Sequence, residues 1–189
     1  MDALSLLTAD HNRVRGLFAR FQTAEEEENT AQTAELAQKI VTELEVHTTI
    51  EEEIFYPAVK GQNEELKDSV DEGVEEHHVA KTLIGEIAGL TPDDDAWAAK
   101  MKVLIESVEH HAQEEEEELF TEVRKAFDKQ ALEDLGMRLE ARKAELGAPT
   151  IADKEHLSTE QLKELAREQE IPGRSSMDRE ELVATVDPS

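Results

Sequence analysis

Residues 47–57, HTTIEEEIFYP, decide the fold of this chain, and residues 111–121, HAQEEEEELFT, repeat their pattern. In both segments a histidine precedes a glutamate by four residues, so the two side chains share one face of a helix. Apolar residues at three- and four-residue spacings, such as Leu44 and Ile54 around His47, indicate that this face is buried. A buried carboxylate without a partner is costly or takes up a proton. A metal cation shared with the histidines is the simplest partner, and the sequence therefore predicts a metal site inside a helical bundle.

Composition narrows the class of protein. A chain of 189 residues allows one main domain and a small appendage. The absence of cysteine excludes disulfides, thiolate zinc sites and iron–sulfur clusters. The formal charge of −26 repels nucleic acid and anionic membranes and attracts cations. Residues 1–7 lack a signal-peptide pattern, and no apolar run approaches the roughly 20 residues of a transmembrane helix, so we expect a cytoplasmic protein without membrane contact.

Apolar spacing and capping residues predict the helices and the domains. The expected helices cover residues 3–22, 30–57, 63–87, 92–127 and 130–146. Asn29 or Thr30 begins the second of them, and Thr91 caps the fourth. The pattern predicts an all-α fold, an up-down-up-down four-helix bundle with an extra helix and a small C-terminal helix–turn–helix appendage. The bundle is expected over residues 1–147, a linker over 148–156 and a small helical module over 157–189.

Each of the first four helices carries one histidine on its apolar stripe. These are His11, His47, His77 and His111. In the third helix His77 lies on the stripe between Val74 and Ile84, whereas His78, like His110 in the fourth, lies about 100° to the side. A lone stripe histidine is more often a packed core residue than a metal ligand. Four of them, two with a glutamate four residues on, are hard to explain by packing, because every buried imidazole needs its own hydrogen-bond partner.

The predicted metal ligands are His11, His47, Glu51, His77, His111 and Glu115. Imidazole and carboxylate without sulfur suit iron, manganese or zinc. Four histidines and two bridging carboxylates suit two ions better than one and leave positions open for water, oxygen or peroxide. The ferritin order, Glu-x-x-His, occurs within the bundle only at residues 75–78, and the His-Glu-x-x-His motif of zinc peptidases is absent.

Residues 1 to about 146 resemble the hemerythrin-like, or HHE cation-binding, family. The matching motifs are Asp10-His11, HxxxEE at 47–52 running to FYP at 55–57, EEH at 75–77, and HxxxEE at 111–116 running to LF at 119–120. The resemblance implies a non-haem centre of two iron ions with an oxo or hydroxo bridge, manganese and zinc being second choices. It places His11 and His47 on one iron, His77 and His111 on the other, and Glu51 and Glu115 across both.

The chain departs from the oxygen-carrying hemerythrins in two ways. Those proteins have a second histidine one turn from the first in the third helix, where Gly73 and Lys81 stand here. They also bridge through an aspartate five residues after the fourth-helix histidine, whereas Glu115 follows at four. One iron therefore lacks a nitrogen ligand unless a nearby side chain supplies a donor, which disfavours reversible oxygen carriage. The candidates are Tyr56, His78 and His110.

Residues 157–186 resemble the small helix–turn–helix at the N-terminus of transcription termination factor rho and in related SAP-like modules. The matching runs are LSTEQLKELA at 157–166, with a capping box from Ser158 to Gln161, IPGRSSM at 171–177 and ELV at 181–183. The resemblance implies nucleic-acid binding. Residues 151–189, however, hold five basic and ten acidic residues, so we expect a protein-contact or vestigial role rather than nucleic-acid binding.

Functions of two classes follow from these observations. The first is a di-iron protein that binds or reacts with O2, hydrogen peroxide or nitric oxide in an oxidative-stress or iron-related role. Peroxide-consuming (catalase-like) or oxidase turnover is an open alternative within that class. The second is a metal or oxygen sensor that signals through its C-terminal segment without turnover. A plainer hypothesis is cation storage by the acidic surface, which predicts weak binding at many sites that survives loss of the histidines.

Overall fold

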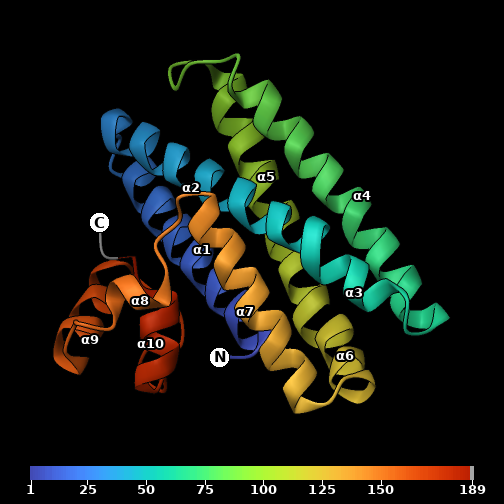
Figure 1. The fold of residues 1–189 in the computed structure, drawn as a ribbon. Coiled ribbons are helices and arrows are strands. Elements are labelled where there is room, and N and C mark those ends of the chain that lie inside the picture. Colours follow the sequence, from blue (N-terminus) through green and yellow to red (C-terminus); the bar gives the residue numbers. More distant parts are fainter. Residues whose placement is uncertain (188–189) are drawn as a thin grey trace.

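The computed structural model describes residues 1–187, which contain helices and no strand. The long helices lie side by side and make up the body of the molecule (Figure 1). They are α1 (Ala3–Glu26), α2 (Thr30–Ile50), α4 (Glu64–Ile87) and α5 (Asp95–Glu114). Because α1 packs mainly on α2 and α4 mainly on α5, the body consists of two pairs of consecutive helices.

Capping side chains set where the helices begin. Asn29 and Asn63 precede α2 and α4, and their side-chain oxygens accept backbone N–H groups of the first turn. The prediction that Thr91 caps the fourth helix was wrong, because α5 begins only after Asp94. The backbone N–H and hydroxyl of Thr91 both donate to the Asp94 carboxylate, which closes a turn ahead of the helix.

Both α2 and α5 continue through a π-helical turn into a further short helix. These elements are η1 (Glu51–Phe55) with α3 (Tyr56–Lys60), and η2 (Glu115–Leu119) with α6 (Phe120–Ala126). In η1 the Tyr56 N–H donates to the Glu51 carbonyl, and in η2 the Phe120 N–H donates to the Glu115 carbonyl. Such turns gather at functional sites. Here each begins at a predicted metal ligand.

Apolar clusters fill the body on both sides of the predicted ligands. One cluster contains Leu4, Leu7, Phe55, Phe120, Val123 and Leu135, and the other contains Val14, Phe18, Phe21, Leu44, Trp97 and Met101. The prediction for Val74 was wrong, since its side chain is 39 % exposed. The buried stripe of α4 runs instead through Val70, Gly73 and His77.

The C-terminal third lies against α1. Helix α7 (Lys129–Glu145) packs along α1, α2 and η1. The expected linker contains a one-turn helix, α8 (Ile151–Lys154), that begins with a capping box. Helices α9 (Thr159–Glu168) and α10 (Arg179–Thr185) share a small apolar cluster of their own, and α10 packs on α1 (Figure 1). None of the helices within residues 1–187 has the length and apolar character needed to cross a membrane.

Candidate metal centre

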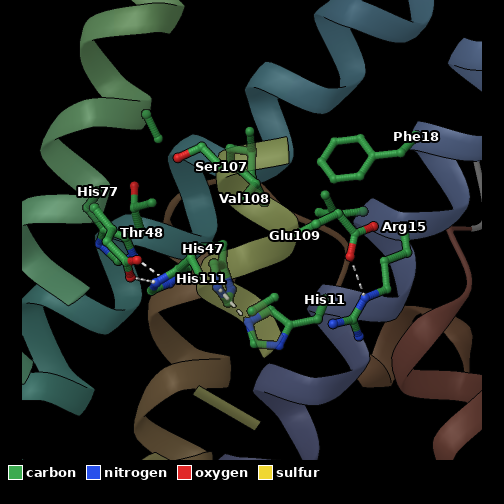
Figure 2. A pocket seen from close by; sticks show the side chains of 15 residues that line it. His11, Arg15, Phe18, His47, Thr48, His77, Ser107, Val108, Glu109 and His111 are labelled. Carbon is green, nitrogen blue, oxygen red and sulfur yellow. Dashed lines mark hydrogen bonds and ion pairs between the residues drawn. The ribbon is translucent and has the colours of Figure 1, made fainter. Parts of the chain in front are cut away.

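The structure brings the six predicted ligand side chains together in the middle of the body, all of them buried. They are His11, His47, Glu51, His77, His111 and Glu115. The imidazoles form two pairs, with Nε2 atoms 3.1 Å apart between His11 and His47 and 3.0 Å apart between His77 and His111 (Figure 2). One histidine of each pair comes from the first helix of its helix pair and the other from the second.

Each glutamate stands between the two imidazole pairs. Glu51 Oε2 lies 3.2 Å from His47 Nε2 and 3.3 Å from His77 Nε2. Glu115 Oε2 lies 3.4 Å from His11 Nε2 and 3.7 Å from His111 Nε2. Each carboxylate therefore lies beside one imidazole of each pair.

Unsatisfied polar atoms show that these residues fit a metal group. Both carboxylate oxygens of Glu51 and Oε2 of Glu115 are buried and have no hydrogen-bond partner among residues 1–187. Such atoms are costly inside a protein unless a cation meets them. Two sets of donors lie within 4.8 Å of one another, one with His11, His47, Glu51 and Glu115 and one with Glu51, His77 and His111. Glu51 belongs to both sets.

The pKa values in the cluster are pushed apart. Burial and the neighbouring carboxylate raise the pKa of Glu51 well above its ordinary range. Burial also acts to raise the pKa of Glu115, but the facing imidazoles outweigh it and hold that pKa low. Burial acts to lower the pKa of His11, yet the adjacent Glu115 and Glu116 carboxylates raise it to about 9, whereas burial and neighbouring imidazoles lower the pKa of His77 to about 3. The protein alone thus holds protons where a cation would bring positive charge, and metal binding should release protons.

The outer nitrogen of every clustered imidazole faces a carboxylate. The Nδ1 contacts are His11 to Glu116 at 2.8 Å, His77 to Glu52 at 2.9 Å, His111 to Glu76 at 2.7 Å and, more distantly, His47 to Asp10 at 3.8 Å. These carboxylates orient the rings so that Nε2 points inward. These four carboxylates were not among the residues predicted from the sequence. The sequence nevertheless contained a signal for them, because each carboxylate directly follows or precedes a predicted ligand. Adjacent side chains on a helix point about 100° apart, so a residue next to an inward ligand points toward the neighbouring helix.

The centre has an internal two-fold pattern. The rings of His11 and His47 have centroids 4.8 Å apart at 68°, and those of His77 and His111 are 4.7 Å apart at 69°. The outer carboxylates repeat as well, since Glu52 pairs with Lys81 at 2.6 Å and Glu116 pairs with Arg15 at 2.8 Å. Lys81 and Arg15 each follow the histidine of their own helix by four residues.

Tyr56 breaks the pattern, because the equivalent position five residues after Glu115 is Phe120. The Tyr56 hydroxyl donates to Glu115 Oε1 at 2.9 Å and lies 3.4 Å from His77 Nε2. Gly73 makes room for it, since a Cβ at that position would lie 2.8 Å from the hydroxyl oxygen. His78 and His110, the other two candidates for an added donor, are exposed. Of the three, only the Tyr56 side chain lies at the centre.

A small apolar cavity lies against the four imidazoles (Figure 2). Its remaining wall includes Val14, Phe18, Leu44, Ala80 and Val108. The midpoint of a water-sized molecule can move within about 20 Å³ of this cavity. A space of about 10–15 Å³ already holds one water. The cavity therefore accommodates one molecule of a few atoms beside the ligands.

Comparison with known proteins identifies the family. Residues 2–123 match the family described as Hemerythrin HHE cation binding domain. The crystal structure of a hemerythrin HHE cation binding domain-containing protein from Mycobacterium kansasii shares the fold, with a TM-score of 0.67 and 19% identity over 98% of this chain and 99% of that chain. A DNA nickase from Nostoc sp. (strain PCC 7120) is 25% identical over 151 residues, which are 77% of this chain but 40% of the nickase, so this chain spans less than half of that relative. Since the family match covers more than half of its length, the chain belongs to the hemerythrin HHE cation-binding family.

Proposed function

We propose that this chain holds two iron ions that bind or react with dioxygen, hydrogen peroxide or nitric oxide. The observation that carries the proposal is the set of buried, unpartnered carboxylate oxygens between two imidazole pairs, beside a cavity for one small molecule. One ion would be held by His11 and His47, the other by His77 and His111, and both by Glu51 and Glu115. Manganese or zinc are second choices with the same donors. The proposed scaffold is an up-down-up-down four-helix bundle with an extra helix and a C-terminal appendage.

Iron, when bound, supplies electrons and open coordination positions for such a molecule. The chain's own residues do the rest. Carboxylates behind the imidazoles hold the rings in one orientation, and the apolar wall of the cavity limits access of water. Burial, Glu51 and Glu115 raise the pKa of Tyr56 well above its ordinary value, so its hydroxyl keeps its proton 2.9 Å from Glu115 at neutral pH.

Iron loading tests the proposal directly. Metal-free protein loaded with Fe²⁺ without oxygen, then freed of excess metal, should contain two irons per chain. His47→Ala should lose at least one of them and any peroxide turnover, whereas His78→Ala, which alters an exposed imidazole, should match the wild type. Fewer than two irons in the wild type contradicts the proposal. Optical spectra after addition of O2, hydrogen peroxide or nitric oxide then distinguish the reacting molecule.

A second function, metal or oxygen sensing through the C-terminal segment, is favoured by one set of contacts. Arg13 lies 3.1 Å from the Asp10 carboxylate, and Asp10 faces His47. The same guanidinium donates to the carbonyl oxygens of Ala184 at 2.7 Å and Thr185 at 2.9 Å. Helix α10 is thereby connected to the surroundings of a proposed ligand. Identical rates of proteolysis after residue 149 in iron-loaded and metal-free protein would exclude this function.

The proposed partners are a small molecule and, through the C-terminal module, a protein. Nucleic acid and membrane are not among them, because a net charge of −26 repels phosphate groups. The likeness to the Nostoc DNA nickase makes DNA worth testing, and supercoiled plasmid incubated with the iron-loaded protein should remain intact. A cytoplasmic location is part of the proposal, since a chain without cysteine suits a reducing compartment.

A further inference from the structure

An acidic crevice runs from the surface toward the metal centre between α4 and the α5–η2 segment. It has a volume of about 50 Å³. Its carboxylates are Glu72, Glu76, Glu114 and Glu118, and His111 and Glu115 also line it. His111 and Glu115 are proposed metal ligands, so the crevice joins solvent to the centre.

The crevice has a group of metal donors at its surface. Glu76, His110 and Glu114 each offer one ligand atom, and these atoms lie within 4.8 Å of one another. His110 is exposed, while the two glutamates are half-buried. One imidazole with two carboxylates suits divalent first-row metals.

A second observation comes from the inner end. Glu115 is 4 % exposed, and its Oε2 atom has no hydrogen-bond partner in the described part of the chain. An acid-lined passage that ends at an unpartnered buried carboxylate attracts cations more strongly toward its inner end. Glu76 connects the two levels, because it belongs to the surface group and its Oε2 lies 2.7 Å from His111 Nδ1.

The internal two-fold pattern supplies a comparison within the same molecule. In register with the ligands, the positions equivalent to Glu72, Glu114 and Glu118 are Leu6, Ile50 and Ile54. Leu6 and Ile50 are buried in the cluster that α7 helps to form, and Ile54 packs against it. The counterpart of Glu76 is Asp10, which is buried and paired with Arg13 and Lys143. The centre is therefore closed on the α1–α2 side, and the acidic crevice lies on the α4–α5 side.

We propose that this crevice is the route by which divalent cations reach the centre, with Glu76, His110 and Glu114 as a transient docking site at its mouth. The inference rests on the proposed metal centre. It assigns the crevice a role in the rate of loading and none in the number of ions finally held.

Loading kinetics test the route. Metal-free protein is mixed rapidly with Co²⁺, whose visible absorption reports its coordination, and with Fe²⁺ in the absence of oxygen. The variant Glu72→Gln/Glu114→Gln/Glu118→Gln should take up metal about tenfold more slowly than the wild type or slower still, because a cleft lined by one sign of charge raises association rates by about 10–10³-fold. Its loading rate should also depend less on ionic strength. Its final content should remain two ions per chain.

A matched control carries the same change of charge elsewhere. Glu25→Gln/Glu26→Gln/Glu27→Gln alters exposed side chains at the C-terminal end of α1, about 20 Å along the helix from His11. This variant should load within about twofold of the wild-type rate, since screening weakens charges more than about 10 Å away.

The outcomes separate the two proposals. Equal loading rates in all three proteins, each with two ions, overturn the route and leave the metal centre intact. Loss of one ion from the crevice variant at an unchanged rate shows a resident ion at the mouth and also overturns the route. A wild type that takes up no metal overturns the proposed function itself.

Discussion

At the scale of single residues, Glu51 shows most clearly what the centre requires. Its side chain is 0 % exposed, lies between two imidazoles and faces Glu115. Burial, together with the neighbouring Glu115 carboxylate, raises the pKa of Glu51. A carboxylate in this position opposes folding unless a cation meets it. Its effect on stability should therefore change sign with the metal.

Replacing Glu51 by glutamine tests whether the effect of this carboxylate on stability changes sign when metal binds. Glu51→Gln should leave the metal-free protein as stable as the wild type or more stable, because an amide cannot ionise and so avoids the negative charge that burial and Glu115 disfavour. The wild type should gain about 2.7 kcal/mol for each ion at a hundredfold excess over Kd. The variant should gain half of the wild-type total or less. Urea unfolding of both proteins, with and without metal, gives the four values.

The control for that variant lies two residues further along. Glu53 is exposed and pairs with Arg142, so Glu53→Gln should leave the stabilisation by metal unchanged. Equal gains in all three proteins would show that Glu51 is not a ligand.

Tyr56 distinguishes one half of the centre from the other, because its hydroxyl is a hydrogen-bond donor and the equivalent residue, Phe120, has none. Tyr56→Phe removes a hydroxyl that donates to Glu115 at 2.9 Å and leaves a buried acceptor unpaired. We expect the metal-free protein to lose about 1–3 kcal/mol. One of the two ions should also bind more weakly in a metal titration. His110→Ala, at an exposed histidine, should have neither effect, and an unchanged titration in Tyr56→Phe would contradict the assignment.

At the scale of elements, the docking of residues 151–187 onto α1 depends on Gly16 of that helix. A Cβ at Gly16 would lie closer than 3.0 Å to the Gln169 carbonyl oxygen and to Ile171 Cδ1. Gly85 of α4 has nothing within 4 Å of the equivalent point. The two glycines thus provide a matched pair of helix positions, one crowded and one open.

Alanine at the two positions should have opposite effects. Gly85→Ala should stabilise the protein by about 0.5–1 kcal/mol through helix propensity. Gly16→Ala should destabilise the protein and increase proteolysis within residues 151–187, because backbone must move to admit the methyl group. Limited proteolysis and thermal unfolding measure both. Equal protection of the module in the two variants would contradict the close approach.

Lys154 makes the same docking dependent on pH. Its Nζ donates to the carbonyl oxygens of Ala184 and Val186 at 3.1 Å each. Burial, with the charges of Arg13 and Lys143, lowers its pKa from 10.5 to about 7. Between these values the unfolded chain binds more protons than the folded one, so the free energy of unfolding should increase as pH rises from about 7.

The difference between wild type and Lys154→Met isolates this contribution. The wild type should gain up to about 1.4 kcal/mol per pH unit more than the variant between pH 7 and pH 9. Denaturant unfolding at several pH values gives the two slopes. Parallel slopes would show that Lys154 does not titrate in this range.

At the scale of the whole molecule, the net charge of −26 opposes compactness. Metal-free protein should therefore have a higher Tm at 0.5 M than at 0.02 M sodium chloride, because salt screens the self-repulsion. Iron-loaded protein should respond less, since bound cations already offset part of the charge at the centre. A Tm that falls with added salt in the metal-free protein would contradict this account.

The helices and the ligand candidates could be predicted because their signals are local. The four-residue spacing of His47 and Glu51, and the helix starts at Asn29 and Asn63, depend on residues within one or two turns. The prediction for Thr91 was wrong because the Asp94 side chain bonds back to it across a turn ahead of the helix. The prediction for Val74 was wrong because the buried stripe of α4 passes through Gly73 instead. The Nδ1 partners were missed because each acts on a neighbouring helix.

The sequence by itself determined that four helices would each carry an inward histidine and that two would add a glutamate, because helical periodicity is a property of one segment. Only the tertiary structure decided that the Tyr56 side chain lies at the centre while His78 and His110 do not, and that Gly16 lets residues 169–171 approach α1. It also decided that the acidic crevice lies on the α4–α5 side. Those facts depend on distances between side chains of different helices, and such distances are set only when the helices pack.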